Sequence, residues 1–233
     1  SLTLERFAGS LPATAAERFK WIGSGARFKL PAGASPATLL KGQLVLVQED
    51  ANGKVQNATT AQLPGALDDL YAAAAGVNDL GLSFPAGGTR WKLWAPTAQK
   101  VLVFSYPNAS GEAEGVHDAV FDPATGVWTA SSATDLSGKS YRYAVEVVVR
   151  GVGLVRNLVT DPYSVALTAD GKRSGVISLQ AAATKPAGWD ASSIPATVQA
   201  TTDMSVYELH VRDFSVSDAT VSPANRGKYA AFG

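Results

Sequence analysis

The sequence contains no cysteine, which excludes disulfides, thiolate metal sites and a cysteine nucleophile. It also lacks an excess of either charge, because 20 Lys and Arg residues balance 20 Asp and Glu residues. Without a basic stripe we expect no nucleic-acid partner. No apolar run approaches the roughly 20 residues of a membrane-spanning helix, so we expect no membrane segment. The two histidines, His117 and His210, have no partners at metal-ligand spacing, and no metal or cofactor is expected.

What the sequence does contain is a series of short apolar segments, separated by Gly or Pro every dozen residues or so. This pattern indicates a mainly β chain. The clearest strand covers residues 141–149, in which Tyr141, Tyr143 and three valines share one face. Further strands are predicted over residues 90–96, 100–106, 117–122 and 126–130. Helix candidates are few, and residues 66–75, which precede Gly76, form one of them.

Changes in composition divide the chain into four parts. We expect an N-terminal β domain over residues 1–82 and a β-sandwich over residues 83–180, with "GLSFPAGG" at their border. Residues 181–203 are rich in Ala, Thr, Ser and Pro and lack strand periodicity, which predicts a linker. Residues 204–233 open with the apolar strand pattern "MSVYELHVRDFS". A start without Met and an end inside this pattern predict a piece of a longer polypeptide.

Several stretches resemble one enzyme family, in chain order. "WKLWAPTAQKVLV" (91–103) and "DPYSVAL" (161–167) resemble the two ends of the β-sandwich that precedes the barrel in debranching members of the α-amylase superfamily. "SVYELHVRDFS" followed by "NRGKY" resembles the first barrel strand and its loop in pullulanases and limit dextrinases. The N-terminal "AERFKWI", "ARFKLPAGA" and "LPGALDDLYA" are similar to the extra domain of bacterial pullulanases.

The resemblance implies two β-sandwich-like domains, the second like a starch- or glycogen-associated carbohydrate-binding module. They would be followed by the first strand of an incomplete (β/α)8 barrel, in which catalytic groups lie at the strand ends. The implied activity of the parent is hydrolysis of α-1,6-glucosidic branch linkages in pullulan, amylopectin or limit dextrins. The implied partners are α-glucan and the remainder of the barrel, and a bacterial, secreted or cell-surface location is favoured.

The catalytic part of the family pattern is missing from the sequence. Retaining glycoside hydrolysis needs two carboxyl groups about 5 Å apart, one as nucleophile and one as acid and base. The family carries them on later strands, in G-F-R-x-D and a following Glu-bearing motif, and neither occurs here. We therefore expect that this chain alone does not hydrolyse glucan and assign no catalytic residue.

Two groups of residues are candidates for other roles. Trp91 and Trp128 are carbohydrate-binding candidates, because aromatic faces pack against the C–H faces of pyranose rings. The alternative is that both belong to the core, the commoner place for large aromatics in strands. Candidates for the junction between sandwich and barrel are Trp94, Asp161, Tyr163, Arg212 and Asp213. For Arg212 and Asp213 the alternative is an ion pair that fixes the strand end. His210 is expected to be a hydrogen-bonded interior residue of the barrel strand.

Two other functions stay open. The chain could be a stand-alone, non-catalytic α-glucan-binding or spacer module. An exposed aromatic patch on the sandwich would favour binding, whereas buried tryptophans would favour a spacer. A related debranching enzyme, isoamylase-like or glycogen-branching, is a third reading, which the "YELHVRDFSV" and "ERFKW" segments disfavour.

Overall fold

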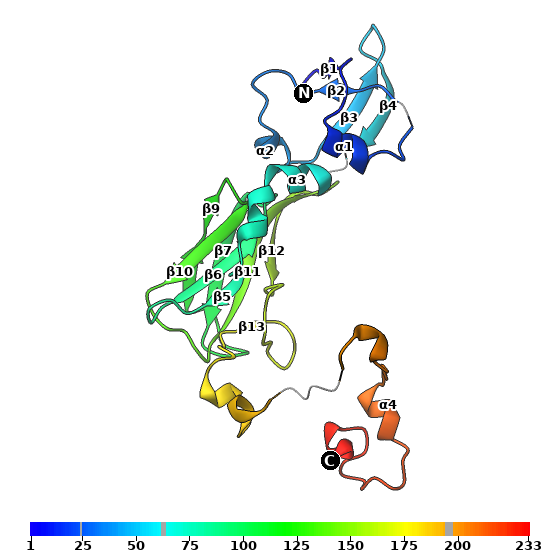
Figure 1. The fold of residues 1–233 in the computed structure, drawn as a ribbon. Coiled ribbons are helices and arrows are strands. Elements are labelled where there is room, and N and C mark those ends of the chain that lie inside the picture. Colours follow the sequence, from blue (N-terminus) through cyan, green and yellow to red (C-terminus); the bar gives the residue numbers. More distant parts are fainter. Residues whose placement is uncertain (24, 62–63, 194–197) are drawn as a thin grey trace. The chain divides into compact units, whose positions relative to one another are not determined.

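The structure is a computed structural model that describes residues 1–23, 25–61, 64–193 and 198–233. The chain divides into two compact units, residues 1–185 and residues 186–233. The first unit holds all of the strands within the described ranges (Figure 1). The predicted linker over residues 181–203 includes positions 194–197, which lie outside the described residues.

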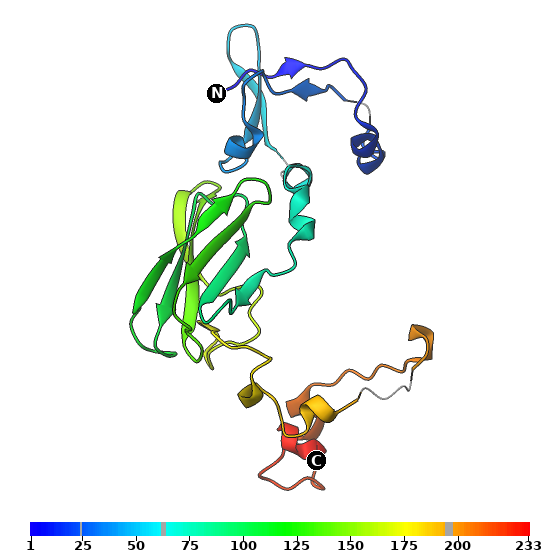
Figure 2. The same cartoon turned by 60° about the vertical axis from the view of Figure 1, so that its left-hand side comes forward.

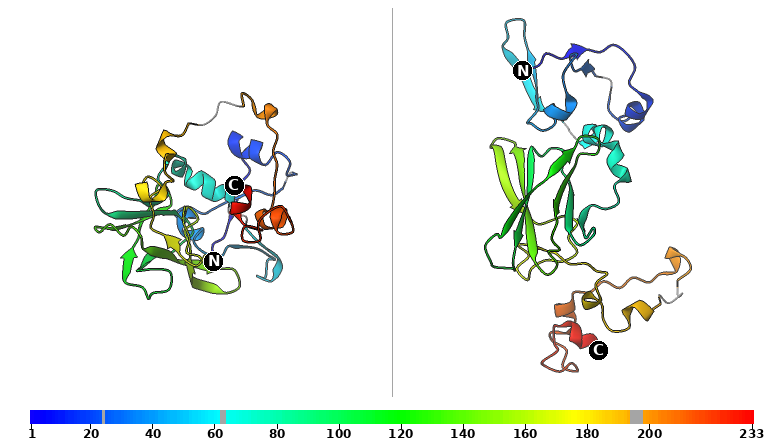
Figure 3. Two further views of the ribbon diagram at one scale, coloured as in Figure 1. Left: turned by 90° about the horizontal axis from the view of Figure 1, so that it is seen from below. Right: turned by 90° about the vertical axis from the view of Figure 1, so that its left-hand side faces the viewer.

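A β-sandwich forms the centre of the first unit. One sheet has the strand order β5–β6–β10–β9, and the other runs β12–β11–β7–β8, with β13 paired to β11. Figures 2 and 3 show the two sheets as facing layers. The strands of this sandwich are β5 (Gly81–Ser83), β6 (Thr89–Trp94), β7 (Lys100–Tyr106), β8 (Gly115–Asp118), β9 (Val120–Asp122), β10 (Val127–Ser132), β11 (Ser140–Val149), β12 (Gly153–Val159) and β13 (Ser174–Gly175).

The alternating strand pattern produces the core between these sheets. On β11 the predicted inward face is confirmed at Tyr141 and Tyr143, which are buried, while Val149 at the far end is exposed because the strand runs past the core. The predicted strands over 90–96 and 100–106 are confirmed as β6 and β7. The core cluster consists of Trp91, Leu93, Ala98, Val101, Val103, Trp128, Ala130, Leu136, Tyr141, Tyr143 and Val176.

The N-terminal part is β-containing but is not a second sandwich. Its strands form two separate two-stranded ladders, β1–β2 and β3–β4. Among its described residues up to position 69, only Leu40 is buried, so this part has no core of its own. Its elements are β1 (Glu5–Arg6), α1 (Ala13–Arg18), β2 (Phe28–Lys29), α2 (Pro36–Leu39), β3 (Val45–Glu49), β4 (Val55–Thr60), α3 (Pro64–Leu70) and the 3-10 helix η1 (Ala72–Gly76).

The helix predicted over residues 66–75 is therefore present as α3 followed by η1. The break comes at Tyr71, whose φ of −113° and ψ of 30° leave the helical region. The Tyr71 side chain is buried, so tertiary packing of this tyrosine accompanies the interruption of the helix. The Tyr71 ring lies edge to face with that of Phe121, at 6.4 Å between centroids, so the segment packs on the sandwich.

The second unit does not contain the predicted barrel strand. Residues 204–210 have no regular secondary structure, and the helix α4 (Val211–Ser215) follows where the strand was expected to continue. A strand needs a hydrogen-bonded neighbour, and none pairs with this segment among the described residues. The prediction of a strand over 205–213 is not confirmed. The other elements beyond β13 are the short 3-10 helices η2 (Ala182–Thr184), η3 (Trp189–Ala191), η4 (Thr201–Asp203) and η5 (Tyr229–Phe232).

Candidate functional site

The two predicted sugar-stacking tryptophans lie inside the sandwich. Trp91 is fully buried and Trp128 is 7% exposed. Trp128 lies opposite Leu93 on one neighbouring strand and Phe121 on the other, so its side chain shares their inward face. Its Nε1 donates a hydrogen bond to the Ala95 carbonyl oxygen at 3.0 Å. Neither ring offers a face to a sugar, so the structure contradicts the stacking prediction and supports the core alternative.

His117 is half-buried and packs against the same core. Its ring centroid lies 5.0 Å from that of Trp91, and its Nε2 is 3.2 Å from Ser105 Oγ. Burial lowers the pKa of His117, so the ring is neutral at neutral pH. Trp91 Nε1 is buried without a hydrogen-bond partner among the described residues. The packing against Trp91 and the contact with Ser105 account for the position of this histidine.

Asp161 is a buried carboxylate at the end of the sandwich. It is 4% exposed and accepts a hydrogen bond from the Tyr141 hydroxyl at 2.6 Å and from the backbone N–H of Tyr163 at 2.8 Å. Its own backbone N–H donates to Ser174 Oγ at 2.9 Å. Burial raises the pKa of Asp161, while the hydrogen bonds from Tyr141, Tyr163 and Tyr143 act in the opposite direction. This network ties the loop after β12 to β11 and β13.

The neighbouring Tyr163 packs against β5. Gly81 has a φ of +88°, and a Cβ atom there would lie 2.8 Å from Tyr163 Cβ. Only glycine fits both the backbone conformation and the close approach. Within the described structure, Asp161 and Tyr163 thus fix a loop of the sandwich. Their assignment to a junction with a barrel stays a prediction.

Trp94 is the last residue of β6. It is half-buried, and its Nε1 donates to the Thr125 carbonyl oxygen at 2.9 Å. Gly126 follows in the same turn, and a Cβ atom on it would come within 3.1 Å of the Tyr71 ring. Trp94 therefore holds the turn against which the segment after α3 packs. Its assignment to the junction with a barrel stays a prediction.

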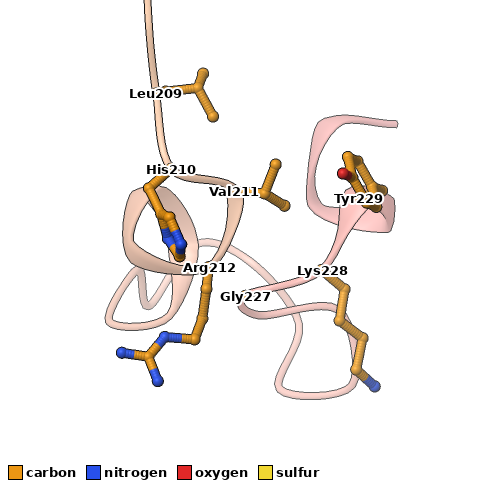
Figure 4. Close-up of a pocket in the computed structure, with 7 residues that line it drawn as sticks. All are labelled: Leu209, His210, Val211, Arg212, Gly227, Lys228 and Tyr229. Atoms are coloured by element: carbon orange, nitrogen blue, oxygen red, sulfur yellow. The ribbon is translucent and has the colours of Figure 1, made fainter. Parts of the chain in front are cut away.

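The second unit brings Arg212 and Asp213 together with His210. Arg212 Nε lies 3.1 Å from Asp213 Oδ1, and His210 Nδ1 lies 3.3 Å from Asp213 Oδ2. All three side chains are exposed, so the ion pair contributes at most about 1 kcal/mol. The expected interior histidine is instead a surface residue at the start of α4. An open cleft of about 560 Å³ is lined by Leu209, His210, Val211, Arg212, Gly227, Lys228 and Tyr229. Figure 4 shows these seven residues.

A second cleft, of about 440 Å³, lies within the first unit. The Lys41 ammonium lies 3.8 Å from the centroid of the Phe121 ring. No motif points to this cleft, because its residues come from three segments that are distant in the chain. It is lined by Ala37, Thr38, Lys41, Gln99 and Phe121.

No group of three or more His, Asp or Glu side chains is arranged to hold a metal ion in the described ranges. Nor does any described helix have the length and apolar character needed to cross a membrane.

Comparison with known proteins identifies both parts of the first unit. The family model described as the pullulanase N2 domain matches residues 1–69. The model described as carbohydrate-binding module 48, the isoamylase N-terminal domain, matches residues 79–164. The two matches follow one another in the chain.

Curated relatives match almost the whole chain. Pullulanase 1, chloroplastic, of Arabidopsis thaliana is 39% identical over 234 residues, which cover 99% of this chain and 24% of the relative. Pullulanase of Klebsiella pneumoniae is 37% identical over 235 residues, which cover 97% of this chain and 22% of the relative. The chain thus spans about a quarter of the length of these relatives.

Solved structures also match almost the whole chain. The crystal structure of PulA from Klebsiella oxytoca matches with a TM-score of 0.87 and 36% identity, over 99% of this chain and 22% of that chain. The maltotriose complex of PulA from Klebsiella pneumoniae matches with a TM-score of 0.87 and 34% identity, over 99% of this chain and 25% of that chain.

Proposed function

The chain is homologous to the N-terminal region of pullulanases, with a pullulanase N2 domain and a carbohydrate-binding module 48, and from this premise we propose its function. It is the accessory region, glucan-binding and barrel-orienting, of an enzyme that hydrolyses α-1,6-glucosidic branch linkages. The substrates of the whole enzyme are pullulan, amylopectin or limit dextrins. Cleavage proceeds with retention through a covalent glycosyl-enzyme.

One observation carries this proposal. Proteins named pullulanase align with 97–99% of the chain, including residues 186–233, which neither family model covers. An unrelated β module that shared only the sandwich would match over the sandwich alone. The continuous match therefore supports a region that belongs with a barrel.

The chain alone supplies binding or orientation and no hydrolysis. The sequence holds neither of the family motifs that carry the nucleophile and the acid/base carboxyl group, and hydrolysis with retention requires both. We expect no release of reducing sugar when the purified chain is incubated with pullulan. Release above the level of a heat-denatured sample would contradict this part of the proposal.

A stand-alone α-glucan-binding or spacer module is the second candidate. The burial of Trp91 and Trp128 favours the barrel-orienting role over sugar stacking on these rings. Glucan binding, if it occurs on the sandwich, must then use other residues.

Affinity electrophoresis distinguishes a chain that binds glucan from one that only orients the barrel. The chain is run in native gels with and without pullulan or amylopectin, beside a protein of similar size that has no carbohydrate affinity. Retardation of the chain relative to this control supports glucan binding. Equal mobility in all gels contradicts glucan binding and leaves orientation of the barrel as the function.

The domain borders are part of the proposal. We assign residues 1–82 to the N-terminal domain, 83–180 to the sandwich, 181–203 to the linker and 204–233 to the start of the barrel. The proposed junction residues between sandwich and barrel are Trp94, Asp161, Tyr163, Arg212 and Asp213.

A further inference from the structure

We infer that the cleft between α2 and the sandwich is an α-glucan subsite, in which Lys41 and Gln99 bind sugar hydroxyl groups. This inference rests on the proposed glucan-binding function and names the place where the glucan is held. The cleft joins residues of the N-terminal part with residues of the sandwich, so the ligand would touch both matched domains.

The state of Lys41 is the first argument. Its ammonium group lies 3.8 Å from the centroid of Phe121 and 5.5 Å from that of Trp128. It forms no ion pair with any carboxylate of the described residues, and burial lowers its pKa. Contacts with ring faces engage one side of an ammonium group and leave other N–H donors free. A partly buried cation with free donors gains from a ligand that offers hydroxyl oxygens.

Gln99 and Thr38 supply the complementary groups. Gln99 Nε2 donates to the Lys41 carbonyl oxygen at 3.3 Å, and its Oε1 has no hydrogen bond to a described residue. Thr38 Oγ1 donates to Ser35 Oγ at 3.2 Å, which leaves its lone pairs available. The lining therefore offers donors at Lys41 and acceptors at Gln99 and Thr38. Sugar hydroxyls both donate and accept, so a polyol can satisfy all three residues.

Size and apolar surface fit the same ligand. The volume of about 440 Å³ falls within the range of roughly 300–1,000 Å³ that is usual for small-ligand sites. Phe121 packs on Trp128, with 5.0 Å between the ring centroids, and its partly exposed portion forms one wall. Ala37 adds a second apolar contact. The C–H faces of pyranose rings would meet these walls while the hydroxyls reach the polar residues.

The charge of the lining argues for a neutral ligand. Lys41 is the single cationic side chain among the residues that line the cleft, and its charge already faces two aromatic rings. Sites that select phosphate or carboxylate groups usually converge several cationic or N–H donors, with arginine prominent. An oligosaccharide therefore fits better than an anion.

The test is a titration of the whole chain, labelled with ¹⁵N, with maltotriose, the β-linked cellotriose and inorganic phosphate. We expect maltotriose to shift the Trp128 indole N–H signal and the backbone signals of Lys41 and Gln99. Lys41→Met keeps the aliphatic stem, and Gln99→Ala removes the acceptor. Lys41→Met should raise the Kd for maltotriose by about tenfold or more, since a hydrogen bond to a charged group is lost. Gln99→Ala, at an exposed neutral side chain, should raise it by about threefold. Lys54→Met, at an exposed lysine in the β3–β4 turn, is the matched control and should leave the Kd unchanged.

The outcomes separate this inference from the proposed function. If the chain binds maltotriose and both variants bind it equally well, the glucan site lies elsewhere and only the inference falls. If no α-glucan binds at any concentration tested, glucan binding and the inference fall together. If phosphate shifts the same signals at lower concentration than maltotriose, the cleft is an anion site. Thermal melting of each variant checks its folding: an unchanged midpoint means that the lost affinity comes from the cleft, and a variant with a lowered midpoint is replaced by Lys41→Gln.

Discussion

Trp91 is the largest of the fully buried side chains in the described structure, and its replacement tests the core assignment. Trp91→Ala removes an indole from between the sheets and leaves a cavity. We expect a loss of about 3–5 kcal/mol in the free energy of unfolding, measured by urea denaturation. Trp21→Ala, at a side chain that is 88% exposed, is the control and should change stability by no more than about 0.5 kcal/mol. Unchanged stability together with lost glucan binding in Trp91→Ala would restore the sugar-stacking role.

Asp161 should make stability depend on pH in an unusual direction. Its pKa is raised in the folded chain, so the native state holds a proton that the unfolded state releases at lower pH. This contribution is fully present below the ordinary pKa of 3.8 and is lost as the pH rises through the higher folded value. We expect Asp161→Asn to flatten the decline in thermal midpoint over this window. Thermal unfolding of both proteins across about pH 2–7 measures the difference.

Asp135 provides a control of opposite sign. Hydrogen bonds from Ser137 lower the pKa of Asp135, so its contribution is present at neutral pH and is lost as the pH falls. Asp135→Asn should therefore reduce the loss of stability below pH 3.8. Asp161→Asn should change the stability above pH 3.8 instead. Parallel pH profiles for Asp161→Asn and the unchanged chain would contradict the raised pKa of Asp161.

Whether a side chain is buried depends on which face of its strand the second sheet covers, and the residue's own segment does not show this. Alternation along one strand places Trp91 and Trp94 on opposite faces, and in the structure Trp91 is buried and Trp94 is half-buried. Alternation within one strand does not say which face meets another layer. Trp128 is buried because it lies between neighbours on β6 and β9. The residues around Trp128 in the sequence do not reveal these neighbours.

At the element scale, a strand can be predicted when its own residues carry a clear β pattern. The strands β6, β7 and β11 carry such a pattern. The strand predicted over 205–213 has the same apolar character, yet residues 204–210 stay unpaired among the described residues. Backbone N–H and C=O groups need a neighbouring strand, and sequence pattern alone does not provide one. For the same reason the cleft at Lys41 was missed, since it exists only after distant segments meet.

The unpaired segment should exchange its amide hydrogens rapidly. No backbone N–H of residues 205–209 donates a hydrogen bond to a described residue, and Val206 and Tyr207 are 85% and 78% exposed. We expect exchange across 206–209 close to that of an unstructured peptide, whereas the amides of β11 are strongly protected. Hydrogen exchange followed by mass spectrometry, with β11 as the internal control, measures both. Strong protection of 206–209 in dilute solution would show that the segment pairs with a strand.

At the scale of the whole molecule, burial is concentrated in one part of the chain. The core cluster runs from Trp91 to Val176. By contrast, Leu40 is the one buried residue described up to position 69, and Ser215 is the one described from 186 onward. Because burial of apolar surface is the main source of folding free energy, the sandwich should dominate the stability of the chain.

This concentration predicts the effect of truncation. A chain that ends at Lys185 keeps every member of the core cluster and all of the sandwich strands. Its calorimetric midpoint should lie within about 2 °C of that of the whole chain, since a shift of several degrees would need a change of about 1 kcal/mol. A chain that ends at Val152 loses β12, β13, Asp161 and Val176, and it should show no cooperative transition. If truncation at Lys185 lowered the midpoint by more than about 5 °C, residues 186–233 would contribute to the stability of the sandwich, and the first unit would not be an independent folding unit.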